Sequence, residues 1–253
     1  MICKLFLCAR LSNVGEWKAI LNAIGDIVEE AMFVVNTDGI SFRGMDPAHV
    51  ALLDITFPKS SFDHFESQTS FFGIRTDDLK TIFNTAANTD IVELKIEDEG
   101  FIKVSVTGSL NMEYNLRLIQ KQEVNTPIPK IECNAKVSLE PNTLSRIILN
   151  IERISEYLTI NCNQKGLEFS GQSDIGNGKI SLDKESTDLI KHELSQDSLA
   201  EYSLEYMGKI IRSIGKASKI VNMEYADKKL LHLLFEMPSN AKAEYYLAPR
   251  IKD

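Results

Sequence analysis

Two short stretches of the sequence carry residue types that could do chemistry. Asp46 and His49 lie three positions apart and could form an acid–base pair. No nucleophile, second base or oxyanion-stabilising group accompanies them, so a role in the wall of a pocket is the better interpretation. Residues 171–179 resemble a glycine-rich phosphate-binding loop, but that motif needs glycine where Ser173 stands and serine or threonine where Ile180 stands. This stretch is therefore predicted to be a hairpin turn.

The cysteines and histidines do not suggest a metal site. The cysteines are scattered without a CxxC pair, and the four histidines show no ligand spacing; the cysteines are Cys3, Cys8, Cys133 and Cys162. We expect free thiols in a reducing compartment, with no metal and no cofactor. No apolar run reaches the roughly 18–20 residues of a membrane span, and the N-terminus lacks the features of a signal peptide. An intracellular protein is the expectation.

Part of the sequence occurs twice. Residues 39–44 read Gly-Ile-Ser-Phe-Arg-Gly, and residues 166–171 repeat the pattern Gly-aliphatic-x-Phe-x-Gly 127 positions later in a chain of 253 residues. In each copy the first glycine suits a hairpin turn, and the alternation places two apolar side chains on one face of a strand. The chain is therefore predicted to contain two similar domains, each long enough to bury its own core.

Each half also contains two apolar stripes at helical spacing. Four windows are predicted to be short amphipathic helices: 17–25, 79–88, 144–153 and 207–219. Asn13 and Glu16 suggest a capping box before the first helix, and Thr76 is expected to cap the second. Alternating stretches such as 91–96 predict antiparallel strands, so the expected fold class is α+β.

Basic residues concentrate in these windows although the protein is acidic overall. A formal net charge of -8 argues against binding to nucleic acid. The windows nevertheless hold eight of the 28 basic residues and only one of the 36 acidic residues, Glu152. A solvated charged face is the alternative for any one helix. Four helices with the same depletion of acid favour a surface that faces DNA phosphates.

Three further motifs carry a resemblance to a known family. They are Gly44-Met-Asp-Pro-Ala-His-Val-Ala-Leu52, Ile175-Gly-Asn-Gly-Lys-Ile-Ser-Leu182 and Glu244-Tyr-Tyr-Leu-Ala-Pro-Arg-Ile251. In order and spacing they resemble segments of the archaeal and eukaryotic sliding clamps, the proliferating cell nuclear antigen family, and the similarity runs end to end. The resemblance implies a non-enzymatic DNA processivity factor. It also implies two clamp domains per chain, with antiparallel sheets outside, four helices inside, and three subunits closed into a ring.

The resemblance further implies an organisation and a set of partners. It divides the chain into an N-terminal clamp domain (1–116), an interdomain connector (117–133) and a C-terminal clamp domain (134–253). The implied partners are duplex DNA without sequence preference, a clamp loader, and a DNA polymerase, flap endonuclease and DNA ligase that dock through short peptides. The implied location is the cytoplasm or nucleoid of an archaeon or the nucleus of a eukaryote. The alternative is a specialised or checkpoint-type subunit of a heterotrimeric ring, and the sequence leaves open whether the three chains are identical.

Three sets of candidate site residues follow. The cations expected to face DNA are Lys18, Lys80, Arg146, Arg153, Lys209, Arg212 and Lys216. The resemblance places the groove for partner peptides at Met45, His49, Val50, Leu52, Ile128, Pro129, Tyr246, Ala248, Pro249 and Ile251. It places the joint between subunits at Tyr114, Gly178, Lys179, Ile180 and Leu182. Several basic positions of the family's helices are replaced here by Gly25, Thr81, Asn84 or Leu149, so weaker or differently distributed DNA contact is expected.

Overall fold

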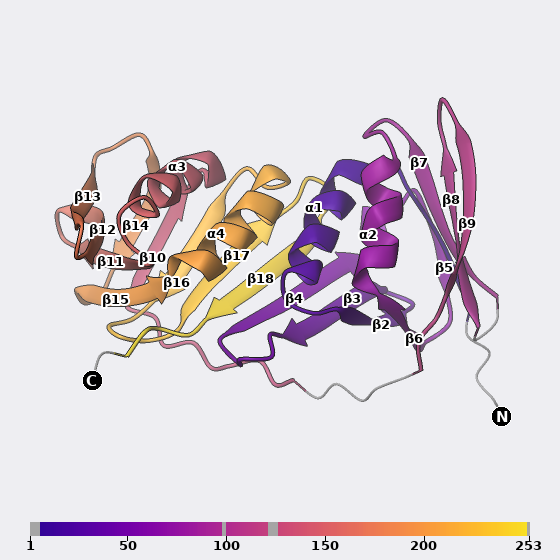
Figure 1. Ribbon diagram of the computed structural model, residues 1–253, viewed down its shortest axis with the longest axis horizontal. Coiled ribbons are helices and arrows are strands. Elements are labelled where there is room, and N and C mark those ends of the chain that lie inside the picture. Colours follow the sequence, from indigo (N-terminus) through magenta and orange to yellow (C-terminus); the bar gives the residue numbers. More distant parts are fainter. Residues whose placement is uncertain (1–5, 98–99, 121–125, 252–253) are drawn as a thin grey trace. The chain divides into compact units, whose positions relative to one another are not determined.

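The computed structural model describes residues 6–97, 100–120 and 126–251, which form two compact units (Figure 1). As far as they are described, residues 1–47, 53–126 and 237–243 belong to the first unit, and residues 48–52, 127–236 and 244–253 belong to the second. No helix within the described residues of either unit has the length and apolar character that a membrane crossing requires.

The first unit contains two helices and two sheets. Helices α1 (Val14–Gly25) and α2 (Thr76–Thr85) pack against each other. One sheet has the order β5-β1-β7-β8-β9 and consists of β5 (His64–Ser67), β1 (Leu7–Leu11), β7 (Ile91–Ile96), β8 (Phe101–Thr107) and β9 (Asn111–Arg117). The other has the order β4-β3-β2-β6 and consists of most of β4 (Ala51–Pro58), β3 (Gly39–Met45), β2 (Glu30–Asn36) and β6 (Ser70–Arg75). A 3-10 turn, η1 (Lys59–Ser61), follows β4.

The second unit repeats this plan. Helices α3 (Pro141–Ile151) and α4 (Leu204–Ser213) lie side by side, and the 3-10 turn η2 (Ile214–Lys216) extends α4. One sheet has the order β13-β12-β11-β15, formed by β13 (Gly176–Asp183), β12 (Gly166–Ser173), β11 (Tyr157–Asn163) and β15 (Ser198–Ser203). The other has the order β14-β10-β16-β17-β18, formed by β14 (Leu189–Leu194), β10 (Ala135–Leu139), β16 (Val221–Tyr225), β17 (Leu231–Glu236) and most of β18 (Lys242–Leu247). The expected α+β class with antiparallel sheets and two similar domains is confirmed.

The apolar stripes of the helices form the cores. In α1, Trp17 is 1% exposed and stacks on Phe57, with ring centres 4.1 Å apart, and on Phe83 of α2 at 5.6 Å. In the second unit, the inward side chains of α3 and α4, such as Ile148 and Met207, are also buried. Because these stripes face the sheets, the opposite helix faces are the ones open to solvent.

The internal repeat corresponds to two equivalent hairpins, β2–β3 and β11–β12. Gly39 has φ 150° and Gly166 has φ 142°, backbone conformations that favour glycine. The asparagines that precede them are also 127 positions apart: Asn36 Oδ1 accepts the N–H of Gly39, and Asn163 Oδ1 accepts the N–H of Lys165. The predicted turn after residue 171 is also a hairpin, since Ser173 pairs with Gly176 across β12 and β13.

Neither predicted cap makes a capping side-chain hydrogen bond, although Asn13 does occupy the N-cap position of α1. Asn13 precedes α1, but neither polar atom of its side chain has a hydrogen-bond partner within the described ranges. Glu16 instead accepts a hydrogen bond from the hydroxyl of Ser239. Thr76 is the first residue of α2 rather than its cap, and its hydroxyl donates to the carbonyl of Val28 at 3.1 Å. Glu16 and Thr76 therefore make tertiary contacts instead of the capping hydrogen bonds that local spacing predicted.

The predicted connector begins as part of the first unit. β9 ends at Arg117, and Ile119 forms an isolated bridge with Gly73, to whose carbonyl its N–H donates at 2.9 Å. Residues 121–125 of the connector lie outside the described part. Residues 126–133 contain no helix or strand and lead to β10. The domain boundaries at 116 and 134 remain predictions.

Candidate DNA-facing helices and partner groove

The two cations expected to face DNA from the first unit are already engaged. Lys18 is half-buried on α1, and its ammonium donates to the carbonyl of Ala86, just beyond the end of α2, at 2.5 Å. Lys80 forms an ion pair with Asp77 one turn earlier, at 2.6 Å. A lysine at a helix C-terminus is favoured by the partial negative charge of the last carbonyls, so the Lys18 contact also stabilises the α1–α2 pair.

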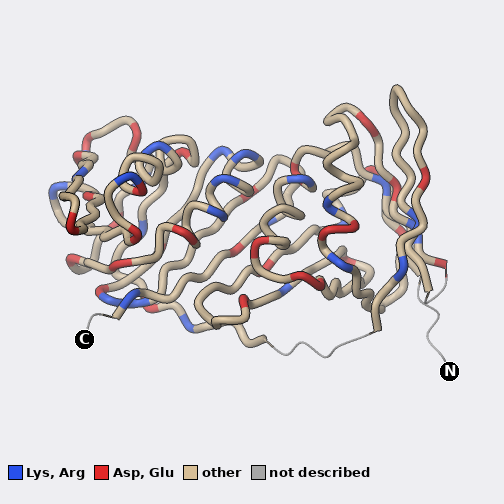
Figure 2. Tube along the Cα trace, viewed as in Figure 1, with Lys and Arg blue, Asp and Glu red and all other residues tan. Residues whose placement is uncertain are grey.

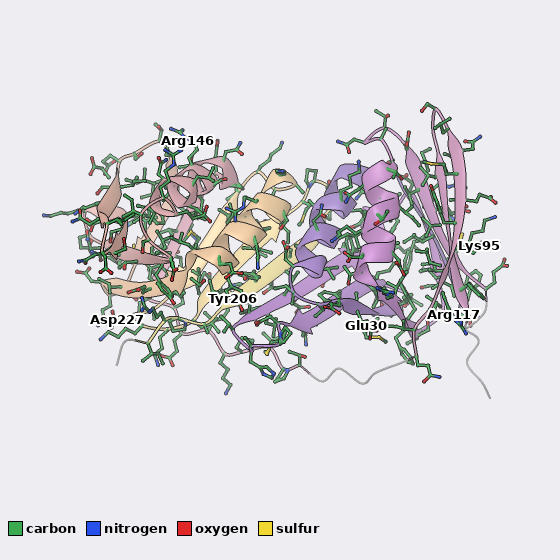
Figure 3. The ribbon with its side chains drawn as sticks, viewed as in Figure 1. Glu30, Lys95, Arg117, Arg146, Tyr206 and Asp227 are labelled. Carbon is green, nitrogen blue, oxygen red and sulfur yellow. The ribbon has the colours of Figure 1, made fainter. Side chains whose placement is uncertain are left out.

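In the second unit the expected cations fall into two groups. Lys209 pairs with Glu205 at 2.7 Å, and Arg212 pairs with Glu152 at 3.0 Å. The other group is exposed and makes no ion pair with the described residues; its members are Arg146, Arg153 and Lys216. Figure 2 shows a basic residue on α3 and further basic residues along α4, and Figure 3 labels Arg146 on α3.

The helices contain more acidic residues than the sequence windows indicated. Acidic residues occupy the first turns of three helices: Glu16 in α1, Asp77 and Asp78 in α2, and Glu205 in α4. Carboxylates there are stabilised by the positive end of the helix dipole. Two of them neutralise lysines of the predicted DNA-facing set. The exposed, unpaired positive charge of that set therefore lies on the second unit.

The groove segments of the second unit meet through the backbone. The N–H of Ala248 donates to the carbonyl of Val50 at 2.9 Å, which joins the C-terminal tail to residues 48–52. Val50, Ala248 and Pro249 are half-buried, and His49 is exposed with φ 59°. The structure thus brings together two of the three predicted groove segments.

The remaining groove residues differ in their exposure. Ile128 is 46% exposed and Ile251 is 82% exposed, whereas Leu52 and Tyr246 are each 2% exposed. Pro129 is half-buried, and Met45, also half-buried, is the one residue of the set that belongs to the first unit. The exposed side chains can contact a peptide directly. Leu52 and Tyr246 can only support it from beneath in this conformation.

Tyr246 belongs to a polar network that the sequence did not predict. Its hydroxyl donates to Glu244 at 2.7 Å, and its ring stacks on His232, with centres 4.7 Å apart. His232 is 6% exposed; its Nε2 lies 3.0 Å from Glu244, and its Nδ1 lies 3.6 Å from Glu224. Burial would raise the pKa of Glu224, but Lys136, at 2.8 Å, and His232 together lower it below its usual value. The network fixes the side chain of Tyr246.

Arg250 is a functional candidate that sequence reasoning missed. Its Nη1 lies 2.9 Å from Glu201, its N–H donates to the carbonyl of Glu201 at 2.7 Å, and its guanidinium carbon lies 3.7 Å from the centre of the Tyr157 ring. These contacts fix the tail immediately after Pro249. The signal in the sequence was a cation within the C-terminal motif, but its partners lie 49 and 93 positions away.

The predicted joint residues lie on two edge strands. Tyr114 is on β9 and is half-buried; the other members of the set are on β13, at the end of the second unit's four-stranded sheet. Lys179 pairs with Glu168 on the neighbouring strand β12. A Cβ at Gly178 would lie 2.9 Å from Ile154 of the same chain. A large side chain at Gly178 would therefore disturb this unit's own packing.

The cysteines that the structure describes are free thiols. They are Cys8, Cys133 and Cys162; Cys3 lies outside the described residues. Burial raises the pKa of Cys162 to about 11, so its thiol stays protonated near neutral pH. Asp46 is buried and His49 is exposed, a difference that does not favour an acid–base pair.

Comparison with known proteins identifies the same family in both halves. Residues 6–120 match the family model described as "Proliferating cell nuclear antigen, N-terminal domain", and residues 127–250 match "Proliferating cell nuclear antigen, C-terminal domain". A relative named "DNA polymerase sliding clamp" from Cenarchaeum symbiosum (strain A) is 36% identical over 244 residues, which are 96% of this chain and 98% of that protein.

Two solved structures extend the similarity to complexes. One is of the C-terminal region of FEN-1 bound to A. fulgidus PCNA: its TM-score is 0.88 at 26% identity, covering 98% of this chain and 99% of that chain. The other is of a PCNA2–PCNA3 complex from Sulfolobus tokodaii, with a TM-score of 0.88 at 25% identity, covering 96% and 99%.

Proposed function

The chain belongs to the proliferating cell nuclear antigen family of DNA polymerase sliding clamps, and on this premise we propose that it encircles duplex DNA as a ring and tethers replication proteins to it. A sliding clamp is a processivity factor and not an enzyme. The proposed partners are a clamp loader, a replicative polymerase, a flap endonuclease and a DNA ligase. The proposed location is the compartment of the cell that holds the DNA.

The observation that carries the ring proposal is a pair of long edge strands. β9 ends the five-stranded sheet of the first unit, and β13 ends the four-stranded sheet of the second. A long edge strand exposes a row of unpaired N–H and C=O groups, which favours pairing with another chain. If β9 of one copy pairs with β13 of the next, the contact is head to tail, and a closed ring covers every such edge.

The tethering proposal depends on the C-terminal tail and residues 48–52. The contact between Ala248 and Val50 gives the tail a fixed extended backbone, and Ile128 and Ile251 supply exposed apolar surface. A partner peptide that carries one aliphatic and two aromatic anchors could bury these surfaces. The division into domains 1–116 and 134–253, joined by a connector at 117–133, belongs to the same proposal.

Sedimentation of the purified single chain tests the ring. We expect the mass of a trimer, and Tyr114→Ala should shift it to the mass of a monomer while far-UV circular dichroism stays unchanged. Tyr114 is the better site than Gly178, whose substitution would disturb Ile154. A monomeric parent chain would refute self-assembly and favour the heterotrimeric alternative, in which paralogues must be added before a ring forms.

DNA extension assays test the tether. With a clamp loader and polymerase, the assembled chain should lengthen the products made in one binding event. Unchanged product length with an intact trimer would contradict the processivity role.

A further inference from the structure

One ion pair crosses between the two helices of the second unit. Arg212 Nη1, on α4, lies 3.0 Å from Oε1 and 3.1 Å from Oε2 of Glu152, which follows the last residue of α3. The two side chains are 44% and 27% exposed. Arg212 belongs to the predicted DNA-facing set, and Glu152 is the one carboxylate in the four helical windows of the sequence.

Gly208 provides the space for this pair. A Cβ added at Gly208 would lie 2.5 Å from Arg212 Nη2 and 2.5 Å from Glu152 Oε1. Gly208 lies in the interior of α4, where glycine is a poor helix former. The sequence thus has a poor helix former at a position where a side chain would displace the ion pair.

The position of Glu152 is also unfavourable for helix stability. The C-terminal end of a helix carries partial negative charge, so a carboxylate there is destabilising, whereas a cation is favoured. Arg212 in the last turn of α4 follows this preference, and Glu152 at the end of α3 does not. The negative charge of Glu152 is therefore unfavourable both at the C-terminal end of α3 and for the binding of phosphates by this helical face. Its evident interaction is with Arg212.

We propose that Glu152 holds Arg212 against α3 and thereby lowers the affinity of the helical face for DNA phosphates. A phosphate must compete with the Glu152 carboxylate for the same guanidinium, which leaves the phosphate contacts of this unit mainly to Arg146, Arg153 and Lys216. A clamp that moves along DNA needs contacts that break easily. This inference rests on the proposed function, because it requires that α3 and α4 face the duplex.

Salt-dependent affinity for a fluorescein-labelled linear duplex tests this proposal with the assembled full chain. Each phosphate contact adds about 0.9 to the slope of log K against log salt, so one extra contact would cost about threefold more affinity between 50 and 200 mM salt. Glu152→Gln removes the charge with little change in shape and should steepen the slope by that amount for each subunit that contacts the duplex, with tighter binding at low salt. Gly208→Ala should act in the same direction, because its Cβ displaces the pair.

The Arg212→Gln background separates this restraint from a general charge effect. If Glu152 acts through Arg212, adding Glu152→Gln to Arg212→Gln should change the affinity by less than twofold. An equal gain from Glu152→Gln in both backgrounds would overturn the proposal, since Glu152 would then act only as a nearby negative charge. An unchanged slope in Glu152→Gln alone would also overturn it.

A control distinguishes failure of this inference from failure of the proposed function. Arg146→Gln with Arg153→Gln should lower the affinity and flatten the salt dependence. If it does so while Glu152→Gln has no effect, the helices face DNA and only the restraint is refuted. If neither change affects DNA binding, α3 and α4 do not face the duplex, and the DNA-facing assignment fails together with the restraint.

Discussion

The guanidinium carbon of Arg250 lies 3.7 Å from the centre of the Tyr157 ring, so a residue of the C-terminal tail is stacked on strand β11. The same side chain pairs with Glu201. Since Pro249 directly precedes Arg250, the stacking limits the positions that the proposed peptide-binding tail can adopt. Partner affinity is therefore expected to depend on a residue that need not touch the peptide.

Arg250→Ala should weaken binding of a Gln-x-x-Leu-x-x-Phe-Phe peptide about fivefold or more, because a cation–π contact is worth roughly 0.5–1 kcal/mol and a partly exposed ion pair roughly 0.2–1 kcal/mol. Titration calorimetry with the assembled protein measures this change. Lys184→Ala, which removes an exposed cation elsewhere in the second unit, is the control and should leave the affinity as it is. Equal affinities for the parent and Arg250→Ala would show that the tail keeps its position without this anchor.

The proposed groove itself is tested by Ile128→Ala combined with Pro249→Ala. We expect the peptide to bind at least tenfold more weakly, about 1.4 kcal/mol, because both apolar contacts are truncated. Trimer mass and melting temperature should hardly change, since neither residue is buried. Ile190→Ala is a matched control: Ile190 is 49% exposed but lies outside the groove set. If the double variant binds like the parent, the groove lies elsewhere.

The sequence predicted best those features that depend on local pattern. The helical stripe that contains Trp17 and the turn glycines Gly39 and Gly166 appear in the structure as predicted. Burial of one helix face and a positive φ each determine residue types within a stretch of a few residues. The predicted capping hydrogen bonds are absent at Asn13 and Thr76. Thr76 uses its hydroxyl in a contact with Val28, 48 positions away.

The candidate sites were predicted as residue types but not as contacts. Lys18 was correctly placed off the apolar stripe, yet spacing could not show that its ammonium donates to Ala86. The windows of the sequence also began after the first helical turns, so the partner of Lys80, Asp77, was left out of the charge count. Ion pairing across elements depends on three-dimensional proximity, and the same limit hid Arg250 from sequence reasoning.

The stability of the second unit should depend on pH through Glu224. Lys136 and His232 lower the pKa of its carboxyl in the folded state relative to the ordinary value of 4.5, despite burial, which acts in the opposite direction. The unfolded chain therefore binds more protons in this range than the folded chain. The resulting stabilisation is fully present above about pH 4.5 and is lost as pH falls through the lowered pKa.

Lys136→Met tests this linkage by urea unfolding at pH 7 and pH 3. At pH 7 the variant should be less stable by about 0.2–1 kcal/mol, the usual range for a partly exposed ion pair, and the difference should shrink at pH 3. Lys191→Met removes a more exposed pair with Glu193 on the adjacent strand and should cost less. A loss for Lys136→Met that is equal at both pH values would indicate lost packing rather than charge.

The final prediction compares cations that have carboxylate partners with cations that do not. Lys80 and Lys209 each pair with a carboxylate in the first turn of the same helix, at 2.6 and 2.7 Å, whereas Arg146 and Arg153 have no ion-pair partner within the described ranges. A phosphate that binds a paired lysine must displace the carboxylate and remain near it. Part of the favourable Coulomb energy is therefore cancelled.

Duplex affinity should consequently fall more for Arg146→Gln with Arg153→Gln than for Lys80→Gln with Lys209→Gln, although both variants remove two positive charges per chain. For each subunit of the ring whose two arginines contact phosphates, the salt slope should decrease by about 1.8, and the lysine variant should show a clearly smaller decrease. Fluorescence anisotropy at several salt concentrations gives both slopes, and sedimentation confirms that the ring is intact. Equal decreases would show that net charge alone governs the interaction and that the pairs in α2 and α4 open freely when DNA is present.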